Sequence, residues 1–325
     1  MPIGYANEEI RHLLCKCQWL DLCSAAAPVL TFTISMMYLI ADSGATKTAW
    51  RLVDGNGRIT QAITAGLSPY YQSQAEIVAE LNSALLPTLG LLATEAAQVH
   101  RIYYYGTGCA RPEKAAVVAA ALHQVFAEAL TEVHPDILGA ARALCGTEPG
   151  IACILGTGSN AALYDGQWLT STAASLGFWL GDEGSGGHLG KQLVIDYLND
   201  DLPAPLRAQF ELRFSPSYAE IMDRVYSQPF PSRYLASFAK FVFDHLREPY
   251  CYQLAYQSFA AFFDKRVSKF PDHQNYKVHF TGSVAFYYAN VLRQVAADRG
   301  IVVKNILEEP VAGLVLYHRS TGDVP

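Results

Sequence analysis

The stretch YLIADSGATKTAW, residues 38–50, runs from an apolar segment through one acidic residue into a turn of small and hydroxylated residues. The apolar segment is typical of a buried β-strand, and the following TAWRLVD alternates as a half-buried strand does. The order of residues is not that of a P-loop, which reads G-x-x-x-x-G-K-[ST] and opens a helix. The stretch therefore predicts a β-hairpin with a tight loop at residues 44–47.

The loop of this hairpin carries groups that suit a phosphate. Small residues let backbone N–H groups approach phosphate oxygens, while threonine hydroxyls and Lys47 add donors and charge. Asp42, at the end of the strand, can hold Mg²⁺ through water. An ordinary polar hairpin uses the same residue types, so the residues alone leave both readings open. The candidate phosphate contacts are Gly44, Ala45, Thr46, Lys47 and Thr48.

The composition favours a globular protein that binds small molecules. The chain has 325 residues, enough for two domains, with 51% hydrophobic and 17% charged residues. Its net charge is −6 and it lacks a Lys/Arg cluster, which argues against a nucleic-acid partner. The seven cysteines form no CxxC pair, so we expect reduced thiols in a cytoplasmic protein.

Residues 1–36 need a separate interpretation. The span between Asp21 and Asp42 has no charge and is long enough to resemble a membrane anchor. Pro28 and several hydroxyl residues dilute it, and a spanning helix would consume the strand that begins at Tyr38. We therefore expect no membrane association. We also expect translation to begin at Met36 or Met37, which would make residues 1–36 a poorly ordered extension.

The pattern of the first part of the chain is repeated in the second. Three strands within residues 38–65 precede a helical pattern and the strand HRIYYYGTG, and GIACILGTGSNAALYDGQWL starts a second series near residue 150. Helices then follow, including a long pair between residues 234 and 270, before YKVHFTGSVAF returns to strand, turn and helix. We expect a duplicated α/β architecture with its boundary at residues 136–150 and a ligand in the crevice between the halves.

Further loops supply candidate contacts. Gly156, Thr157 and Gly158 follow an apolar strand as the first loop does, so two such loops could clasp a polyphosphate. In SLGFWLGDEGSGGHLGKQL, Asp182 could accept hydrogen bonds from sugar hydroxyls or could cap a helix. Asp136 could likewise be a general base or a helix cap. The residues Gly282 and Ser283 open a helix in a way that suits a nucleotide or a tight turn.

Five motifs together resemble the N-acetylglucosamine kinase branch of the BadF/BadG/BcrA/BcrD-type ATPases, within the actin/hexokinase/Hsp70 superfamily. DSGATKT and LGTGSN look like its two phosphate loops, LGDEGSG like the sugar-kinase signature, FTGSVA like the adenosine motif, and PDILGAARAL like the segment with the catalytic aspartate. The match covers residues 37 to about 320.

The resemblance implies an α/β fold of duplicated RNase H-like domains, as in actin-like ATPases, with a nucleotide and sugar cleft between them. The first domain would contain residues 37–137 and 310–325, and the second residues 138–309. The enzyme would use Mg-ATP to phosphorylate the primary hydroxyl of an amino sugar, N-acetylglucosamine or a related cell-wall sugar. The oligomeric state stays open, with a homodimer as one option.

The resemblance also assigns roles to residues. Asp136 would be the catalytic base and Asp42 would organise Mg²⁺. The ATP contacts would include Thr46, Thr157, Ser283 and Ala239, and the sugar contacts would be Asp136, Ser159, Asn160, Ser175, Leu176, Gly177 and Asp182. One departure concerns the loop AGLSPYYQ. Sugar-binding members have an asparagine there and this chain has none, which leaves recognition of an acetamido group open.

Two alternatives come from other functional classes. An ATPase activator of a reductive enzyme would need cysteines placed to hold an iron–sulfur cluster, and Cys109 and Cys145 lack that context. A sugar- or nucleotide-sensing regulator often carries a DNA-binding module, for which residues 1–36 show no helix-turn-helix pattern. The sequence therefore favours the kinase.

Overall fold

The computed structural model describes residues 36–325 of the chain. The extension predicted at the N-terminus falls on residues 1–35, which lie outside the described part. Among residues 36–325, the helices are too short or too polar for any of them to span a bilayer.

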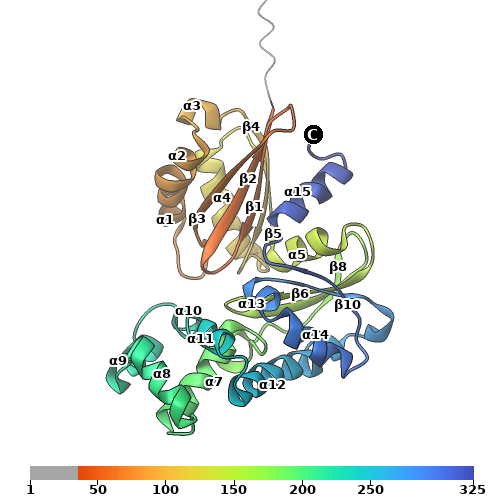
Figure 1. Cartoon of the computed structure of the whole chain (residues 1–325). Coiled ribbons are helices and arrows are strands. Elements are labelled where there is room, and N and C mark those ends of the chain that lie inside the picture. Colours follow the sequence, from red (N-terminus) through yellow and green to blue (C-terminus); the bar gives the residue numbers. More distant parts are fainter. Residues whose placement is uncertain (1–35) are drawn as a thin grey trace, which may run out of the picture. The chain divides into compact units, whose positions relative to one another are not determined.

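Two five-stranded sheets form the framework, and they repeat one strand order (Figure 1). The first sheet has the order β3-β2-β1-β4-β5 and the second has β8-β7-β6-β9-β10 when read in the same sense. In each sheet the first three strands pair antiparallel and the other two pair parallel to the first. The strands are β1 (Met37–Ser43), β2 (Lys47–Val53), β3 (Ile59–Ala65), β4 (Val99–Gly106), β5 (Leu130–Pro135), β6 (Gly150–Leu155), β7 (Ser159–Tyr164), β8 (Leu169–Thr172), β9 (Val278–Thr281) and β10 (Val303–Leu307).

The hydrophobic pattern explains the position of these strands. The central strands β1, β4, β6 and β9 are buried along nearly their whole length, as expected for strands covered on both faces. β3 is different, because its exposed and buried residues alternate as in an edge strand with one solvated face. The duplicated architecture predicted from the sequence is therefore present.

Helices of the first half cover the outer face of its sheet. They are α1 (Gln74–Glu80), the π-helical η1 (Leu81–Leu85), α2 (Leu86–Leu89), α3 (Ala93–Ala96) and α4 (Pro112–Val125). Apolar residues of α1, η1, α2 and α4 form one buried cluster with residues of β1, β2 and β4.

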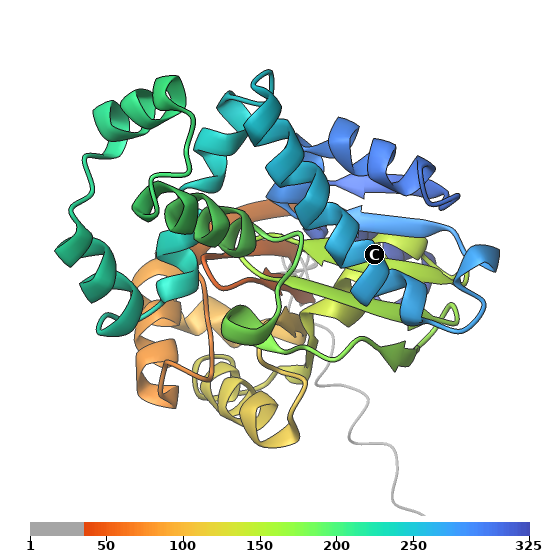
Figure 2. The ribbon, with the colours of Figure 1, turned by 90° about the horizontal axis from the view of Figure 1, so that it is seen from below.

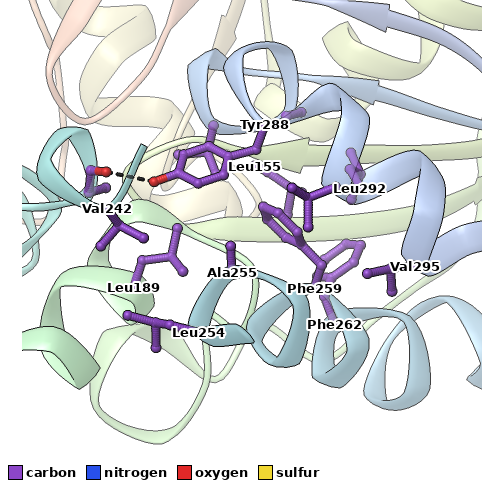
Figure 3. Packing of buried hydrophobic residues seen from close by; sticks show 14 of the residues in the cluster. Leu155, Leu189, Val242, Leu254, Ala255, Phe259, Phe262, Tyr288, Leu292 and Val295 are labelled. Carbon is purple, nitrogen blue, oxygen red and sulfur yellow. Dashed lines mark hydrogen bonds between the residues drawn. The ribbon is translucent and has the colours of Figure 1, made fainter. Parts of the chain in front are cut away.

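The second half carries more helices than the first. They are α6 (Gly177–Leu180), α7 (Gly186–Leu198), α8 (Ala204–Phe214), α9 (Tyr218–Tyr226), α10 (Pro231–Ala236), α11 (Ala239–Asp244), α12 (Pro249–Lys265), η2 (Val267–Lys269), η3 (His273–Asn275), α13 (Ser283–Tyr287) and α14 (Ala289–Ala297). Figure 2 shows α8 and α9, in green, standing away from the strands of both sheets. Figure 3 shows the core beneath this half, where Phe259 and Phe262 of α12 pack with Leu292 and Val295 of α14.

The prediction of two long helices between residues 234 and 270 is wrong. The structure has two short helices, α10 and α11, followed by the long α12. Pro249 explains the last break, because its ring disfavours helical geometry at residue 248 and its missing N–H fits the first position of a new helix. Glu248 is accordingly extended, with φ −78° and ψ 129°.

A third apolar core joins the two sheets. Helix α5 (Asp136–Cys145) follows β5, and α15 (Val311–Ser320) follows β10. Both contribute to one buried cluster with side chains of β1 and β4 from the first sheet and of β6 and β7 from the second. The two helices touch closely, since a Cβ added to Gly313 would lie 2.7 Å from the carbonyl oxygen of Ala143.

Candidate active site

The two glycine- and threonine-containing loops meet between the sheets. We call residues 43–48 the first loop and residues 156–160 the second loop. In the first, the Gly44 N–H donates to the Lys47 carbonyl at 2.9 Å, which closes the hairpin predicted from the sequence. In the second, the Gly156 N–H donates to the Gly158 carbonyl at 2.9 Å. The hydroxyl oxygens of Thr46 and Thr157 are 3.2 Å apart, so one threonine from each half reaches the same point.

A pocket of about 540 Å³ opens beside these two threonines. This volume lies in the range of small-molecule sites. Its lining combines polar backbone with the apolar and aromatic side chains of α10, α11 and α13. The pocket is lined by Thr46, Gly156, Thr157, Gly186, Arg233, Ala236, Ser237, Ala239, Lys240, Phe243, Ser283, Val284, Tyr287 and Tyr288. The structure thus brings five predicted nucleotide contacts together, namely Thr46, Gly156, Thr157, Ala239 and Ser283.

Tyr288 connects this pocket to the core below it. Its hydroxyl donates to the Ala239 carbonyl at 2.6 Å, shown as the dashed line in Figure 3. Its ring packs against Phe259 with centroids 5.7 Å apart. Because both contacts are buried, they fix the start of α11 and hence the position of Ala239 in the pocket wall.

The remaining predicted phosphate residues do not line the pocket. Thr48 is fully buried, with its hydroxyl 2.8 Å from the Ser43 hydroxyl and 3.0 Å from the Ala65 carbonyl. Ala45 offers its carbonyl to Arg233, and Lys47 forms an ion pair with Glu309. Gly44 forms the hairpin closure described above.

The glycines Gly158 and Gly282 allow close packing around the second loop. A Cβ on Gly158 would lie 3.0 Å from a carboxylate oxygen of Asp182. Gly282 has φ +110°, and a Cβ there would lie only 2.3 Å from the Leu155 carbonyl oxygen. Glycine is therefore needed at residue 282 for α13 to begin against the end of β6.

Two carboxylates with raised pKa values lie beside the loops. Burial, and to a smaller extent the negative charges of Asp136 and Glu309, raise the pKa of Asp42 to about 7, while Lys47 opposes the rise. Burial also raises the pKa of Asp136 to about 6, against hydrogen bonds from the Ile137 N–H and the Thr107 hydroxyl. Such a pair can take up a cation or exchange a proton.

The geometry of Asp136 is compatible with both roles that the sequence left open. It is the first residue of α5, and its Oδ1 accepts the Ile137 N–H at 2.8 Å, as a capping carboxylate would. Its raised pKa is that of a group able to act as a base near neutral pH. Capping and proton transfer are thus compatible at this position.

Asp182, one of the predicted sugar contacts, adjoins the second loop. Its Oδ1 accepts the Ser159 N–H at 3.3 Å, and its backbone has φ +60°. Burial raises its pKa above the ordinary value for aspartate. The side chain of Asn160 binds the adjacent backbone, because its oxygen accepts the Ala161 N–H at 2.9 Å.

Glu183, beside Asp182, forms a buried ion pair that stabilises the structure. It is buried and accepts hydrogen bonds at 2.9 Å from both Lys265 and Arg266 of the α12 region. Burial works against its charge, yet these two cations lower its pKa to about 2. Arg266 also donates to the Ala174 carbonyl. The ion pair therefore braces the segment that leads into residues 175–177.

The residues 175–177 themselves stay at the surface. Ser175 and Leu176 are exposed, and Gly177 has φ +68° at the start of α6. The hydrogen bonds among residues 36–325 do not link this segment to Asp136 or Asp182. Gly177 nevertheless accepts the Gly181 N–H at 2.9 Å, and Leu176 packs against Gly181, the residue before Asp182. The structure therefore gathers Ser159 and Asp182 at the second loop, holds Leu176 and Gly177 next to Asp182, and leaves Ser175 exposed.

Several residues of the site gave no signal in the sequence. Glu309 reaches the first loop from the segment before α15, and Arg233 reaches it from α10. Phe243 and Tyr287 form an aromatic wall with ring centroids 5.7 Å apart. A pattern of aromatic residues after FTGSVA could have indicated Tyr287. Nothing local marks Arg233 or Glu309, because their role arises from contacts between distant segments.

A metal ion would find few protein ligands here. Within the described range, no three His, Cys, Asp or Glu side chains are grouped closely enough to form a metal-binding cluster. Asp42 and Asp136 nevertheless supply the carboxylate oxygens that Mg²⁺ prefers, and Mg²⁺ commonly uses one or two carboxylates with water and substrate phosphates. The donors present therefore fit a magnesium ion shared with a nucleotide.

Comparison with solved structures gives the chain's relatives. A protein of Porphyromonas gingivalis named "Putative N-acetylglucosamine Kinase" is 39% identical, with 88% of this chain and 100% of that chain covered and a TM-score of 0.82. A Chromobacterium violaceum protein of the same name is 20% identical, with 87% and 99% covered and a TM-score of 0.68. MreB 5 of Spiroplasma citri, bound to AMPPNP, is 8% identical, with 88% and 95% covered and a TM-score of 0.56.

These matches differ in what they show. The second and third show a shared fold, which confirms the predicted actin-like architecture. No family model and no curated protein matches the chain. The first match is both close in sequence and complete in length. On that ground, and on the repeated strand order of its two sheets, the chain belongs to the N-acetylglucosamine kinase-like branch of the actin-like ATPases.

Proposed function

We propose that the protein is an ATP-dependent sugar kinase that phosphorylates the primary hydroxyl of an amino sugar, with N-acetylglucosamine as the first candidate. The observation that carries this proposal is the meeting of Thr46 and Thr157 at the wall of the 540 Å³ pocket. Two hydroxyl-bearing loops from opposite halves suit a triphosphate, and the aromatic wall suits a purine base.

The carboxylates supply the remaining chemistry. Asp136 would accept the proton of the sugar hydroxyl as its oxygen attacks the γ-phosphate, giving a sugar phosphate and ADP. Asp42 would hold Mg²⁺, which neutralises charge on the phosphates when bound. A pKa of about 6 leaves Asp136 mostly ionised at neutral pH, as a base requires. The names of the two bacterial kinases support the choice of sugar.

Asp182 supports a sugar site at the second loop. Its carboxylate lies against the second loop, where it could accept hydrogen bonds from sugar hydroxyls. The loop with Ser68, Pro69 and Tyr70 lies near Asp136. Tyr70 packs against Gly108, and the neighbouring Thr107 donates a hydrogen bond to Asp136. This loop contains no asparagine, so another group would have to contact the acetamido group of an N-acetylated sugar.

An ATP-consumption assay tests the proposal. The purified full chain is given Mg-ATP and, one at a time, N-acetylglucosamine, glucosamine, N-acetylmuramic acid, N-acetylmannosamine and glucose. We expect strong turnover with one N-acetylated amino sugar and a product phosphorylated at its primary hydroxyl by NMR. A response no higher than the sugar-free background for all five would overturn the proposal.

A further inference from the structure

We propose that Arg233 binds the phosphate groups of the nucleotide, exchanging its present carbonyl partner for phosphate oxygens. The inference rests on the proposed function only in taking ATP as the ligand. Arg233 lines the pocket from α10 and donates to the Ala45 carbonyl in the first loop. It therefore stands at the junction where Thr46 and Thr157 meet.

The balance of charge in the pocket singles out this residue. Lys240, the other cation in the lining, donates to both carboxylate oxygens of Asp244 at 2.7 and 3.0 Å. Lys47, close by, is paired with Glu309. Within residues 36–325, Arg233 has no carboxylate at ion-pair distance, and its buried Nε has no hydrogen-bond partner. It is thus the lining cation whose charge is not balanced by an acid.

A partly desolvated cation without an opposing charge is unfavourable. In this structure the guanidinium is held by a neutral carbonyl and by the ring of Phe230, 4.4 Å from the centroid. A polyphosphate would provide the missing negative charge, and the planar guanidinium matches two phosphate oxygens at once. An arginine at residue 233 can therefore bind phosphate through its charge and its planar donors, which a neutral residue could not do.

The backbone conformation of Phe230, three residues before Arg233, is a second unusual feature of this part of the pocket wall. Phe230 has φ +61°, a left-handed conformation that is costly for a side chain of its size. Its ring lies against Tyr71 of the first half, with centroids 4.9 Å apart. The strained turn thus presents Arg233 toward the first loop while its aromatic ring reaches the other half of the molecule.

A different role is possible in principle: Arg233 could be a strut that only fixes the hairpin. The two roles differ in which ligand they affect. A phosphate contact needs the positive charge of residue 233, whereas a strut needs only a donor for the Ala45 carbonyl. Arg233→Gln keeps a neutral donor and therefore separates the roles: it should lose ATP affinity if Arg233 contacts phosphate and should keep it if Arg233 is only a strut.

The test measures binding of Mg-ATP and of adenosine to the full chain by calorimetry, without sugar. Arg233→Met should weaken Mg-ATP binding by about tenfold to a hundredfold, in keeping with the loss of charge-assisted hydrogen bonds, and change adenosine binding by less than about twofold. Arg233→Lys should recover part of the ATP affinity, because it keeps the charge without the fork.

Arg224→Met is the matched control, because Arg224 is exposed on α9, lies over the ring of Tyr234 and does not line the pocket. It should leave both affinities unchanged. Equal losses for ATP and adenosine in Arg233→Met, no loss of ATP affinity, or wild-type ATP affinity in the neutral Arg233→Gln would overturn the phosphate assignment. A wild-type chain that binds no Mg-ATP would overturn it together with the kinase. A chain that binds ATP through Arg233 but phosphorylates no sugar would refute the kinase alone.

Discussion

The pocket beside the two loops and the segment around Asp182 and Glu183 depend on different interactions. Glycine, alanine and threonine dominate the pocket wall near the loops, so backbone lies close to the ligand space. In the second region, the carboxylate of Glu183 instead depends on the cations Lys265 and Arg266. The first region should therefore be sensitive to added volume, and the second to lost charge. The proposed base, Asp136, belongs to neither region.

The largest effect on turnover is expected from a change at Asp136. Asp136→Asn keeps the shape and the helix-start position but cannot accept the hydroxyl proton, so kcat should fall by about 10²–10⁴-fold. Mg-ATP affinity should not fall, because removing a negative charge relieves repulsion with the phosphates. Steady-state kinetics and calorimetry measure the two quantities. Turnover within threefold of wild type would rule out Asp136 as the base.

The charge-dependent side is tested by Glu183→Gln. The change leaves Arg266 buried without its partner, and we expect a loss of about 3 kcal/mol in the free energy of unfolding. The matched control is Asp264→Asn, whose carboxylate is exposed and pairs with Arg299, and there the loss should be below about 1 kcal/mol. Urea unfolding compares them, and equal losses would show that burial of the ion pair makes no difference.

The volume-dependent side is tested by Gly282→Ala. The new methyl group would meet the Leu155 carbonyl at a position with φ +110°, and we expect a loss of about 2–3 kcal/mol together with a higher KM for ATP. Gly300→Ala shares the positive φ but has no atom within 4 Å, and it should cost about 1 kcal/mol with an unchanged KM. Thermal unfolding measures the two stability losses and a kinetic assay measures the two KM values. A larger loss for Gly300→Ala than for Gly282→Ala would contradict the steric argument.

The smallest effect concerns pH and Asp42. Its pKa rises from 3.8 to about 7 on folding, so the folded protein binds more protons than the unfolded chain between these pH values. Stability contributed by the protonated group is therefore lost as pH rises through that window. Asp42→Asn should stabilise the protein at pH 8 by on the order of 1–2 kcal/mol, with the gain vanishing near pH 3.5. Melting curves across pH test this, and a gain equal at both ends would exclude the titration of Asp42 as its source.

The sequence predicted those features that depend on neighbouring residues. An apolar strand followed by glycine and threonine indicated each loop, and the same signal twice indicated the duplication. The order of strands in the two sheets and the gathering of Thr46, Thr157, Ala239 and Ser283 agree with those patterns. The roles assigned to these residues remain predictions.

The contacts between distant segments could not be predicted in the same way. Arg233 and Ala45 are 188 residues apart in the chain, and Lys47 and Glu309 are 262 apart. No periodicity or turn signal links such positions, since only the packing of the two halves brings them together. Thr48 illustrates the reverse case: its residue type suits phosphate, but the strand pairing turns its hydroxyl into the interior.

The shared core around α5 and α15 has a consequence for the order in which the protein is made. Helix α15 comes after all ten strands in the chain, yet it closes the apolar layer that both sheets contribute to. While the ribosome is still synthesising residues 311–320, the inner faces of both sheets lack part of their cover, and partly folded chains with exposed apolar surface are prone to aggregate. The nascent protein should therefore depend on chaperones until its last helix emerges, although the first sheet can pair its strands long before.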